Sequence, residues 1–241
     1  MDAHATALAA RLESVRQRIA TACIRHHRHE DAVQLLAVSK TFSADDVAAA
    51  YAAGQTAFGE NYVQEAVQKI TLLRHLPLEW HCIGPIQSNK TRLVAEHFDW
   101  VQSIDRMQIA QRLSQQRPAQ RDVLQVCIQV NIDGGPTKSG VAPADVPALA
   151  REIAALPRLR LRGLMCIPDP VDDATGQVAV FARATALWES LRAQGWELDT
   201  LSMGMSADLD AAIAAGSTMV RVGSAIFGYR TPKPPAVPPS P

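Results

Sequence analysis

Lys40 is the first residue placed to do covalent chemistry, because it ends the apolar run QLLAVSK. A lysine at the end of an apolar strand is partly removed from water, and desolvation favours its neutral amine over the ammonium. A neutral amine attacks a carbonyl carbon to form an imine. The alternative is an ordinary strand-end lysine whose charged tip reaches back to solvent. Lys40 is therefore a candidate for imine chemistry, and the alternative of an ordinary solvated lysine stays open.

Two segments near the C-terminal end carry the residue types that bind a phosphate group. In MGMSADLDAAIAAG a strand ends at Gly204, and Ser206 is predicted to cap the helix that follows. In VRVGSAIFG, Gly223 and Ser224 follow another strand and begin a short helical turn. Glycine permits close approach, while hydroxyls and helix N-termini bind negative charge. Each segment alone is also typical of plain helix capping, but both together with Lys40 favour a phosphate site.

Arg221 and Asn61 could contact a ring held between these groups, whereas His81 is more ambiguous. Arg221 ends the last apolar run and is always charged, so beside a pyridine nitrogen it would oppose protonation of the ring and disfavour transamination. An ion pair at the rim is the alternative for Arg221. Asn61 is expected to hydrogen-bond the ring. His81, inside an apolar run, is interpreted as a hydrogen-bonded core residue.

Two other polar clusters are interpreted as solvent-exposed. The cluster Arg25 to His29 lies at the end of the predicted first helix, where cations complement the helix dipole. Metal binding there is the alternative, but no cysteine or carboxylate set with ligand spacing accompanies it. In QVNIDGGPTKSG, the Gly-Gly-Pro run predicts a mobile loop from Gly134 to Gly140, and Lys138 is a solvated lysine or an anion contact.

The elements that position these residues alternate between strands and helices. Short apolar, β-branched runs are each followed by a stretch with helical spacing, which is the signature of repeated βα units. The eight runs are Gln34 to Ser39, Thr56 to Gly59, Glu79 to Gly84, Trp100 to Ser103, Val123 to Asn131, Arg160 to Ile167, Thr200 to Met203 and Met219 to Gly223.

Helix boundaries are predicted from capping residues. A helix of residues 4 to 29 precedes the first strand. The predicted signals are an N-cap at Ser43 and a stop at Gly54, a cap at Asp105, Pro143 in a first turn, and Asp172 and Asp173 opening a helix that runs to Arg192.

The strict alternation predicts an α/β protein, a single (β/α)8 TIM-type barrel with an extra N-terminal helix, over residues 1–230. An open doubly wound sheet is the alternative. In either fold, reactive groups collect at the C-terminal ends of the strands, where Lys40, Asn61, Ser206 and Arg221 are expected. The segment TPKPPAVPPSP, residues 231–241, predicts a disordered Pro-rich tail, with an SH3-type ligand as the lesser alternative.

Composition excludes several classes of partner. The chain has 241 residues, 47% hydrophobic and 20% charged, which is typical of a globular protein with a substantial core. Its formal net charge of zero gives no field that attracts nucleic acid or an anionic membrane. The cysteines Cys23, Cys82, Cys127 and Cys166 form no C-x-x-C pair and are interpreted as buried reduced thiols. With no apolar signal or membrane-spanning run, a cytoplasmic protein is expected.

Several of these segments together resemble the pyridoxal phosphate homeostasis protein family. The resemblance extends from about Gln34 to Gly228, and the segments that carry it are LLAVSK, FGENYVQE, WHCIGPIQSNK, VNIDGGPTKSG, GLMCIP, LSMGMSADLDAAIAAG and VRVGSAIFG. This family is similar in fold to the N-terminal barrel of alanine racemase. The resemblance implies a monomer that binds pyridoxal 5'-phosphate and buffers or delivers it, with transient contact with apo enzymes as a further expectation.

The resemblance also implies roles for particular residues. Lys40 carries the imine, Asn61 lies along the ring and Arg221 faces the pyridine nitrogen. The phosphate contacts fall on Met205, Ser206, Gly223 and Ser224. No metal is expected. The chain departs from the family at Gly134, Gly135 and Pro136, where relatives often carry an acidic residue, so the role of that loop stays open.

Robust catalysis is not expected. Racemisation needs an acid and a base on opposite faces of the substrate carbon, and racemases of the resembling fold take the second group from another domain across a dimer. A chain filled by one barrel has no such domain. The alternatives are a small pyridoxal-phosphate-dependent amino-acid racemase that uses Tyr62, His81 or water, and a cofactor-free aldolase in which Lys40 attacks a sugar phosphate.

Overall fold

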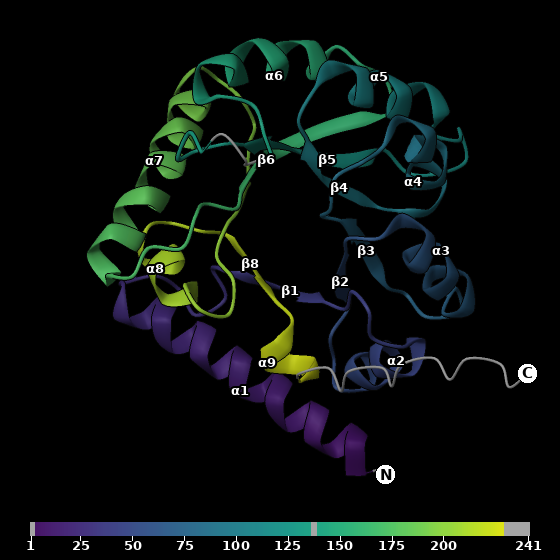
Figure 1. Ribbon diagram of the computed structural model, residues 1–241, viewed down its shortest axis with the longest axis vertical. Coiled ribbons are helices and arrows are strands. Elements are labelled where there is room, and N and C mark those ends of the chain that lie inside the picture. Colours follow the sequence, from purple (N-terminus) through teal and green to yellow (C-terminus); the bar gives the residue numbers. More distant parts are fainter. Residues whose placement is uncertain (1–2, 136–138, 229–241) are drawn as a thin grey trace, which may run out of the picture.

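The strands of the protein close into a parallel barrel. The computed structural model describes residues 3–135 and 139–228 (Figure 1). In sequence order each strand pairs with the next, and the first also pairs with the last. The strands are β1 (Gln34–Val38), β2 (Ala57–Glu60), β3 (Glu79–Cys82), β4 (Trp100–Ile104), β5 (Leu124–Val130), β6 (Leu159–Cys166), β7 (Thr200–Ser202) and β8 (Met219–Val222).

This closure confirms the predicted TIM-type barrel and shows that the open doubly wound alternative is wrong. Each predicted run overlaps its strand, and no boundary differs by more than two residues. The prediction succeeds because a strand of a barrel is covered on both faces, so it is apolar along nearly its whole length. The run VLQVCIQV, for example, contains β5, in which all residues but Gln125 are buried.

Helices surround the barrel. They are α1 (Ala3–Arg25), α2 (Ala44–Ala52), α3 (Val63–Leu72), α4 (Thr91–His97), α5 (Met107–Gln116), α6 (Val146–Ala154), α7 (Ala174–Ala193), α8 (Leu209–Ala214) and α9 (Ser224–Phe227), with short 3-10 turns η1 (Ser88–Lys90) and η2 (Pro143–Asp145). The main apolar core lies between these helices and the strands, as in other barrels of this class.

Several predicted helix boundaries are confirmed. Ser43 caps α2, and its side chain and that of Asp46 form a reciprocal capping box. Gly54 follows α2 with a φ of 85°, a conformation that favours glycine, so the chain leaves the helix there. Asp173 caps α7 through the Gly176 N–H at 2.7 Å. Pro143 opens η2, the turn that leads into α6.

Two predicted boundaries in the first half of the chain are wrong. The first helix ends at Arg25 instead of residue 29, because His27 adopts a φ of 56° and the Arg28 N–H turns back to the Cys23 carbonyl at 2.9 Å. Asp105 does not cap α5. The N-cap residue is Arg106, and the Asp105 carboxylate pairs with its guanidinium at 2.6 Å instead.

The extra helix α1 is part of the packed core. It contacts α2, α8 and α9 through a buried stripe that includes Leu8, Leu12, Val15 and Ile19. Figure 1 shows α1, in purple, lying across α8 and α9, beside the point where the chain leaves β8. The helix therefore supports the segments that follow the last two strands.

The described residues also bear on three other expectations. All four cysteines are free and buried, as predicted. Among residues 3–135 and 139–228, no helix combines the length and apolar character needed to cross a membrane. Lys138 and the Pro-rich segment 231–241 lie outside the described residues, so the predictions for them stay predictions.

Candidate functional site

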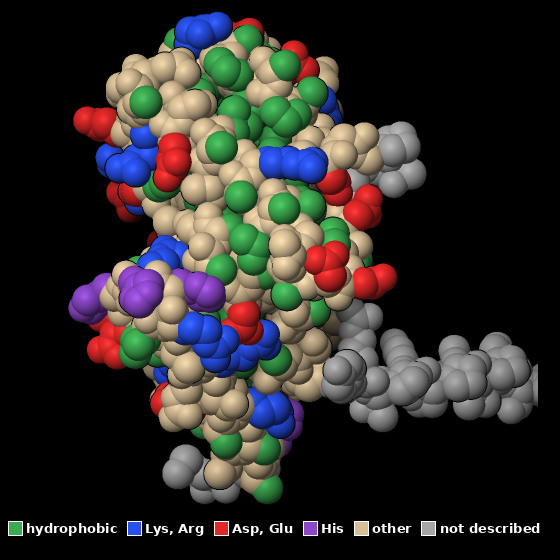
Figure 2. Space-filling model, turned by 90° about the vertical axis from the view of Figure 1, so that its left-hand side faces the viewer, with side chains coloured by type: hydrophobic (Ala, Val, Ile, Leu, Met, Phe, Trp, Pro, Cys, Tyr) green, Lys and Arg blue, Asp and Glu red, His purple; other side chains and the backbone are tan. Residues whose placement is uncertain are grey.

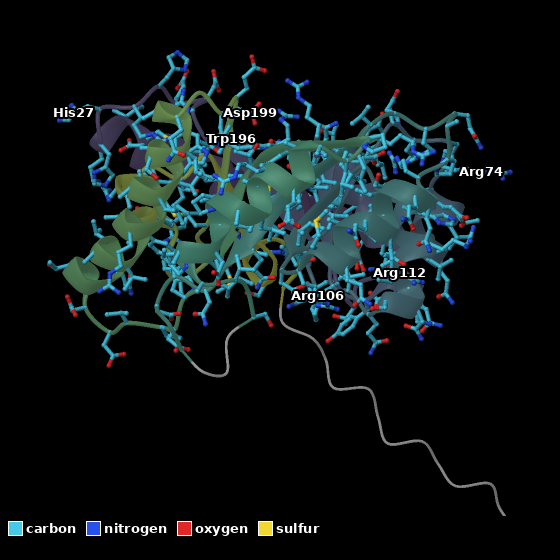
Figure 3. All side chains as sticks on the ribbon, turned by 90° about the horizontal axis from the view of Figure 1, so that it is seen from above. His27, Arg74, Arg106, Arg112, Trp196 and Asp199 are labelled. Atoms are coloured by element: carbon cyan, nitrogen blue, oxygen red, sulfur yellow. The ribbon has the colours of Figure 1, made fainter. Side chains whose placement is uncertain are left out.

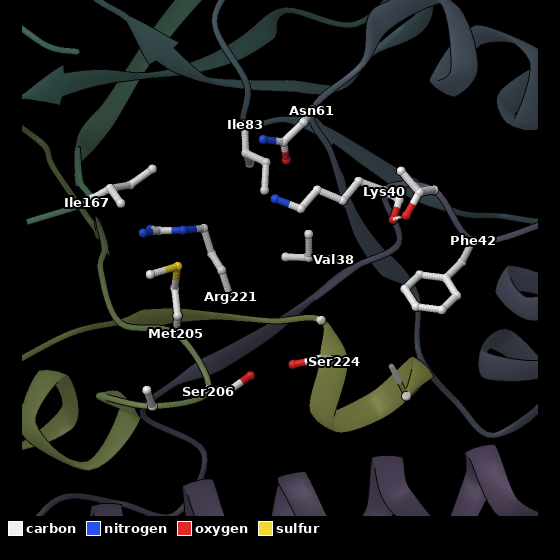
Figure 4. A pocket seen from close by; sticks show the side chains of 14 residues that line it. Val38, Lys40, Phe42, Asn61, Ile83, Ile167, Met205, Ser206, Arg221 and Ser224 are labelled. Atoms are coloured by element: carbon white, nitrogen blue, oxygen red, sulfur yellow. Dashed lines mark hydrogen bonds between the residues drawn. The ribbon is translucent and has the colours of Figure 1, made fainter. Parts of the chain in front are cut away.

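The seven residues singled out from the sequence line one cavity at the mouth of the barrel. This cavity, called here the Lys40 pocket, has a volume of about 480 Å³. Its walls include Lys40, Asn61, Met205, Ser206, Arg221, Gly223 and Ser224. In Figure 4, Lys40 points its amine into the pocket, and the Ser206 and Ser224 hydroxyls face each other at another edge. The barrel thus gathers groups from both ends of the chain.

A buried polar network fixes the chain just before Lys40. The Ser39 hydroxyl donates to Glu60 Oε1 at 2.6 Å, and Lys69 Nζ donates to that same oxygen and to the Ser39 carbonyl, both at 2.7 Å. Glu60 is fully buried, and burial raises its pKa although the Lys69 ammonium acts in the opposite direction. The network ties β1 to β2 and α3, so the residue preceding Lys40 has little freedom.

Thr41 then redirects the chain. It has a φ of 69°, an uncommon conformation for a β-branched residue, and its N–H donates to the Glu65 carboxylate, which also pairs with Lys69. A turn held in this way sets the direction in which the Lys40 side chain leaves the backbone. Sequence reasoning missed the supporting residues Glu60 and Lys69. The available signal was an acidic residue at a strand end followed by a lysine on the next helix.

The segment after β7 forms one edge of the pocket. Gly204 has a φ of 94°, and a Cβ there would lie 2.5 Å from the Ala212 Cβ, so the turn requires glycine. The prediction that Ser206 caps the next helix is wrong. Helix α8 starts at Leu209, and the Met205 N–H donates to the Asp208 carboxylate within the intervening turn. Ser206 therefore lies in the turn, where its hydroxyl is available to the pocket.

The segment after β8 forms the adjoining edge. Gly223 is the N-cap residue of α9, and Ser224 is its first helical residue, as predicted. A Cβ at Gly223 would lie 3.2 Å from the Val38 carbonyl, so the backbone passes close to β1 here. Within this turn the Ile226 and Phe227 N–H groups donate to the Gly223 carbonyl, whereas the first N–H groups of a helix have no partner within it and add donors next to the Ser224 hydroxyl.

Arg221 is a buried cation on the pocket wall. Its side chain donates to the Ser202 hydroxyl at 2.7 Å and to the Cys166 carbonyl at 2.8 Å. No carboxylate among the described residues pairs with it, so the predicted alternative of a rim ion pair does not hold for them. Burial lowers the pKa of the Arg221 guanidinium from its ordinary value. A guanidinium has five N–H donors, which leaves some of them for a ligand.

Asn61 and three apolar side chains complete the pocket. Asn61 Oδ1 is buried without a hydrogen-bond partner among the described residues, so this oxygen can accept a hydrogen bond from a ligand. Gly84 makes room for it, since a Cβ at Gly84 would lie 2.4 Å from the Asn61 carbonyl. The apolar walls are Val38, Ile83 and Ile167. They provide surface for the faces of a ring.

The histidines lie outside this site. His81 is fully buried and both of its ring nitrogens are hydrogen-bonded, which confirms the prediction of a core residue. Figure 2 shows histidine side chains gathered on the surface next to Lys and Arg side chains. No cluster of three or more His, Cys, Asp or Glu side chains suited to a metal ion occurs in the described ranges.

Comparison with known proteins identifies the family. The family model for the alanine racemase N-terminal domain matches residues 10–231. A pyridoxal phosphate homeostasis protein of Vibrio alginolyticus is 59% identical over 84% of this chain and 89% of its own. One from Pseudomonas aeruginosa is 56% identical over 92% of this chain and 96% of its own. The chain belongs to the pyridoxal phosphate homeostasis protein family.

Solved structures agree with this membership. PipY of Synechococcus elongatus, solved with PLP bound, has a TM-score of 0.80 and 40% identity, and the match covers 92% of this chain and all of that one (100%). An alanine racemase of Corynebacterium glutamicum has a TM-score of 0.66 at 21% identity. The match covers 93% of this chain but only 61% of the racemase. At this low identity the likeness is one of fold alone.

The residues of the Lys40 pocket fit pyridoxal phosphate chemically. An amine can bond to the aldehyde, hydroxyls and backbone N–H groups can bind the phosphate, and the Asn61 oxygen, unpartnered among the described residues, can accept a hydrogen bond from a ring substituent. The Arg221 guanidinium suits a pyridine nitrogen that carries no proton, because a pyridinium would repel it. The roles of the seven residues toward the cofactor stay predictions.

Proposed function

We propose that this protein binds pyridoxal 5'-phosphate in the Lys40 pocket and acts in the homeostasis or delivery of the cofactor. Family membership supports the function, and the arrangement of the pocket supports its location. The observation that carries the proposal is that the Lys40 amine shares one cavity with the Ser206 and Ser224 hydroxyls. One small molecule with an aldehyde and a phosphate can contact both sides.

Each group has a separate part in this binding. The Lys40 amine holds the aldehyde carbon as an imine, and the backbone and hydroxyls of Ser206, Gly223 and Ser224 hold the phosphate, with Met205 beside them. Asn61 and Arg221 orient the ring. Bound cofactor supplies an electron sink for chemistry at amino-acid carbons. A charged guanidinium at the ring nitrogen weakens that sink, so binding without robust turnover is the favoured function.

The pocket offers little support for racemisation. Catalysis on both faces of a substrate carbon needs a second proton-transfer group. Tyr62 is 56% exposed and does not line the pocket, while His81 is fully buried with both nitrogens engaged. Neither is therefore placed as that group. Exchange of the α-hydrogen of alanine for deuterium at a rate typical of enzymes would restore the racemase alternative.

The deciding experiment locates the covalent bond. We expect the purified protein to take up pyridoxal phosphate with a visible absorption band that disappears on borohydride reduction. Mass spectrometry of the digested product should place one cofactor on the peptide that contains Lys40. The Lys40→Ala variant should lose the trapped adduct but keep weak, reversible binding, because the phosphate contacts remain.

Lys90→Ala is the matched control for this experiment. Lys90 is half-buried at the same end of the barrel and lines a neighbouring hollow that also includes Asn61, so its loss should leave the Lys40 adduct intact. An undiminished adduct on another lysine in Lys40→Ala would show that the assignment is wrong. A protein that never takes up the cofactor would refute the proposed function, and a cofactor-free aldolase would then be the remaining candidate.

We further propose that the protein acts in the cytoplasm as a monomer that meets apo enzymes transiently. Four buried free thiols are the usual state of cysteines in a reducing compartment. Sedimentation of the protein at micromolar concentration should give the mass of one chain. A stable dimer would overturn the proposed monomer.

A further inference from the structure

A chain of hydrogen bonds runs through the interior of the barrel from the Lys40 pocket toward its opposite end. Arg221 donates to the Ser202 hydroxyl at 2.7 Å, and that hydroxyl donates to Gln102 Oε1 at 2.7 Å. Gln102 Nε2 lies 2.9 Å from His81 Nδ1, and His81 Nε2 lies 2.7 Å from Glu79 Oε1. The five residues come from β8, β7, β4 and β3, and Glu79 is the first residue of its strand.

Every donor in this chain points the same way. The Gln102 amide nitrogen can only donate, so His81 Nδ1 accepts, and the His81 proton is then on Nε2, facing Glu79. A reversed Gln102 amide would turn its oxygen toward two acceptors, His81 Nδ1 and the Met219 sulfur, which now lies 3.1 Å from Nε2. The orientation of each group thus follows from that of its neighbour. Hydrogen bonds aligned in this way strengthen one another in a low-dielectric interior.

The chain of hydrogen bonds has a positively charged residue, Arg221, at one end and a negatively charged residue, Glu79, at the other. Arg221 is 4% exposed, and Ser202, Gln102 and His81 are fully buried, whereas the Glu79 side chain is 40% exposed. Burial opposes ionisation of Glu79, but hydrogen bonds, first that from His81, outweigh it and leave the pKa of the carboxyl below its ordinary value. This series of direct hydrogen bonds thus connects the buried Arg221 guanidinium to a carboxylate.

The ring of His81 has little freedom to leave this arrangement. It stacks on Trp100 with centroids 5.0 Å apart and an interplanar angle of 11°. On the Trp100 ring also lies the Arg162 guanidinium, at 4.7 Å, and Arg162 pairs with Asp199. Arg162 contacts Trp100 and Asp199 contacts Arg162, but neither belongs to the chain of hydrogen bonds.

We propose that Ser202, Gln102, His81 and Glu79 are positioning residues that hold Arg221 in the orientation in which it meets the cofactor ring, so that Glu79 influences cofactor binding from across the barrel. This inference rests on the proposed function. None of the four residues lines the pocket, and their action passes through Arg221. A polar core that served packing alone would stabilise the barrel equally whether or not cofactor is bound.

The test is a double-mutant cycle on pyridoxal phosphate affinity. Ser202→Ala removes the first link, and we expect about tenfold weaker binding, as for a lost buried hydrogen bond to a charged group. Glu79→Gln neutralises the far end with little change of shape, and we expect about threefold weaker binding. The double variant should bind no more weakly than Ser202→Ala alone, because the cut chain cannot transmit the second change.

Two further measurements separate positioning from plain stability. The visible absorption band of bound cofactor should shift in both single variants, since the field of Arg221 on the ring changes, while the melting temperature of the cofactor-free protein reports stability separately. Asp199→Asn is the matched control. Asp199 lies on the face opposite Arg106 (Figure 3), carries the same charge as Glu79 and stands outside the chain. It should change neither affinity nor the band.

The outcomes are distinct. Additive losses of affinity, or variants that lower the melting temperature but leave affinity and the absorption band unchanged, would overturn the positioning role while the proposed function stands. An Asp199→Asn effect equal to that of Glu79→Gln would also overturn it, because unspecific charge would then be the cause. Wild-type protein that binds no pyridoxal phosphate would overturn both proposals.

Discussion

At the scale of single residues, the proposed binding mode assigns covalent attachment and phosphate binding to different parts of the Lys40 pocket. The amine of Lys40 follows β1, and the hydroxyls follow β7 and β8, so each can be removed without changing the other. Arg221 adds a buried positive charge that stays in place through neutral hydrogen-bond partners. Loss of one hydroxyl should therefore lower the affinity for the cofactor without lowering the covalent yield at saturating cofactor.

Ser206→Ala tests that separation. We expect about tenfold weaker pyridoxal phosphate binding, because one hydroxyl donor to a charged phosphate is lost, with full yield of the borohydride-trapped adduct at saturating cofactor. Equilibrium titration by absorbance measures the affinity, and mass spectrometry measures the yield. Ser190→Ala, on the outer helix α7, is the control and should change neither. Unchanged affinity in Ser206→Ala would remove this serine from the phosphate contacts.

Single residues also mark the limit of what the sequence predicts. Lys40 and Ser224 could be found because their positions at strand ends place them at the mouth of any barrel of this class. The supporting roles of Glu60 and Lys69 could not be assigned in this way, because an acidic residue at a strand end and a lysine on the next helix gain their importance only from contact with Ser39 in the folded βα unit. The same holds for Gln102, whose partners lie on three other strands far away in the sequence.

At the scale of elements, helix α1 supports the segments that contribute the hydroxyls. Arg18 donates to the Ser206 carbonyl at 2.8 Å and pairs with Asp210 at 2.6 Å. Arg11 Nε donates to the Ile226 carbonyl in α9 at 2.6 Å. The sequence predicted an additional helix before the barrel, but neither its packing on α8 and α9 nor these contacts followed from periodicity. Which face of the barrel a preceding helix covers is decided by tertiary packing.

Arg18→Ala should weaken cofactor binding more than it weakens the fold. We expect the affinity for the cofactor to fall about threefold, because the turn at Ser206 loses the hydrogen bond to its carbonyl. The melting temperature should change by no more than about 2 °C, as for a partly exposed ion pair. Arg25→Ala is the matched control, since Arg25 lies on the same helix and, within ranges 3–135 and 139–228, its side chain bonds only to Asp210, at 3.4 Å. Equal effects of the two variants on affinity would show that α1 does not stabilise the Ser206 turn for cofactor binding.

At the scale of the whole molecule, closure of the barrel seals its thiols away from solvent. Burial raises the pKa of Cys82, Cys127 and Cys166 to about 12, and that of Cys23 is raised as well. The thiolate is the reactive form of cysteine, so reactivity requires opening of the structure. The sequence predicted buried thiols because three of them stand in apolar runs.

Thiol labelling should therefore report global unfolding. At pH 8 we expect native protein to resist iodoacetamide and all four cysteines to react in strong denaturant, with the transition matching that seen by circular dichroism. Intact mass spectrometry counts the labels, and free cysteine added to the same reaction controls for reagent quality. Rapid labelling of one native thiol would show local opening of the strand that carries it, or of α1 in the case of Cys23.

The pairing of β1 with β8 has a consequence for the order in which the protein becomes functional. On the ribosome Lys40 emerges well before the segments proposed to bind the phosphate and before β8, the strand that completes the sheet. A nascent chain consequently exposes the reactive amine long before it can retain a phosphorylated aldehyde. In the proposed binding mode, capture of the cofactor must therefore wait until β8 and the segment after it have emerged and the barrel has closed.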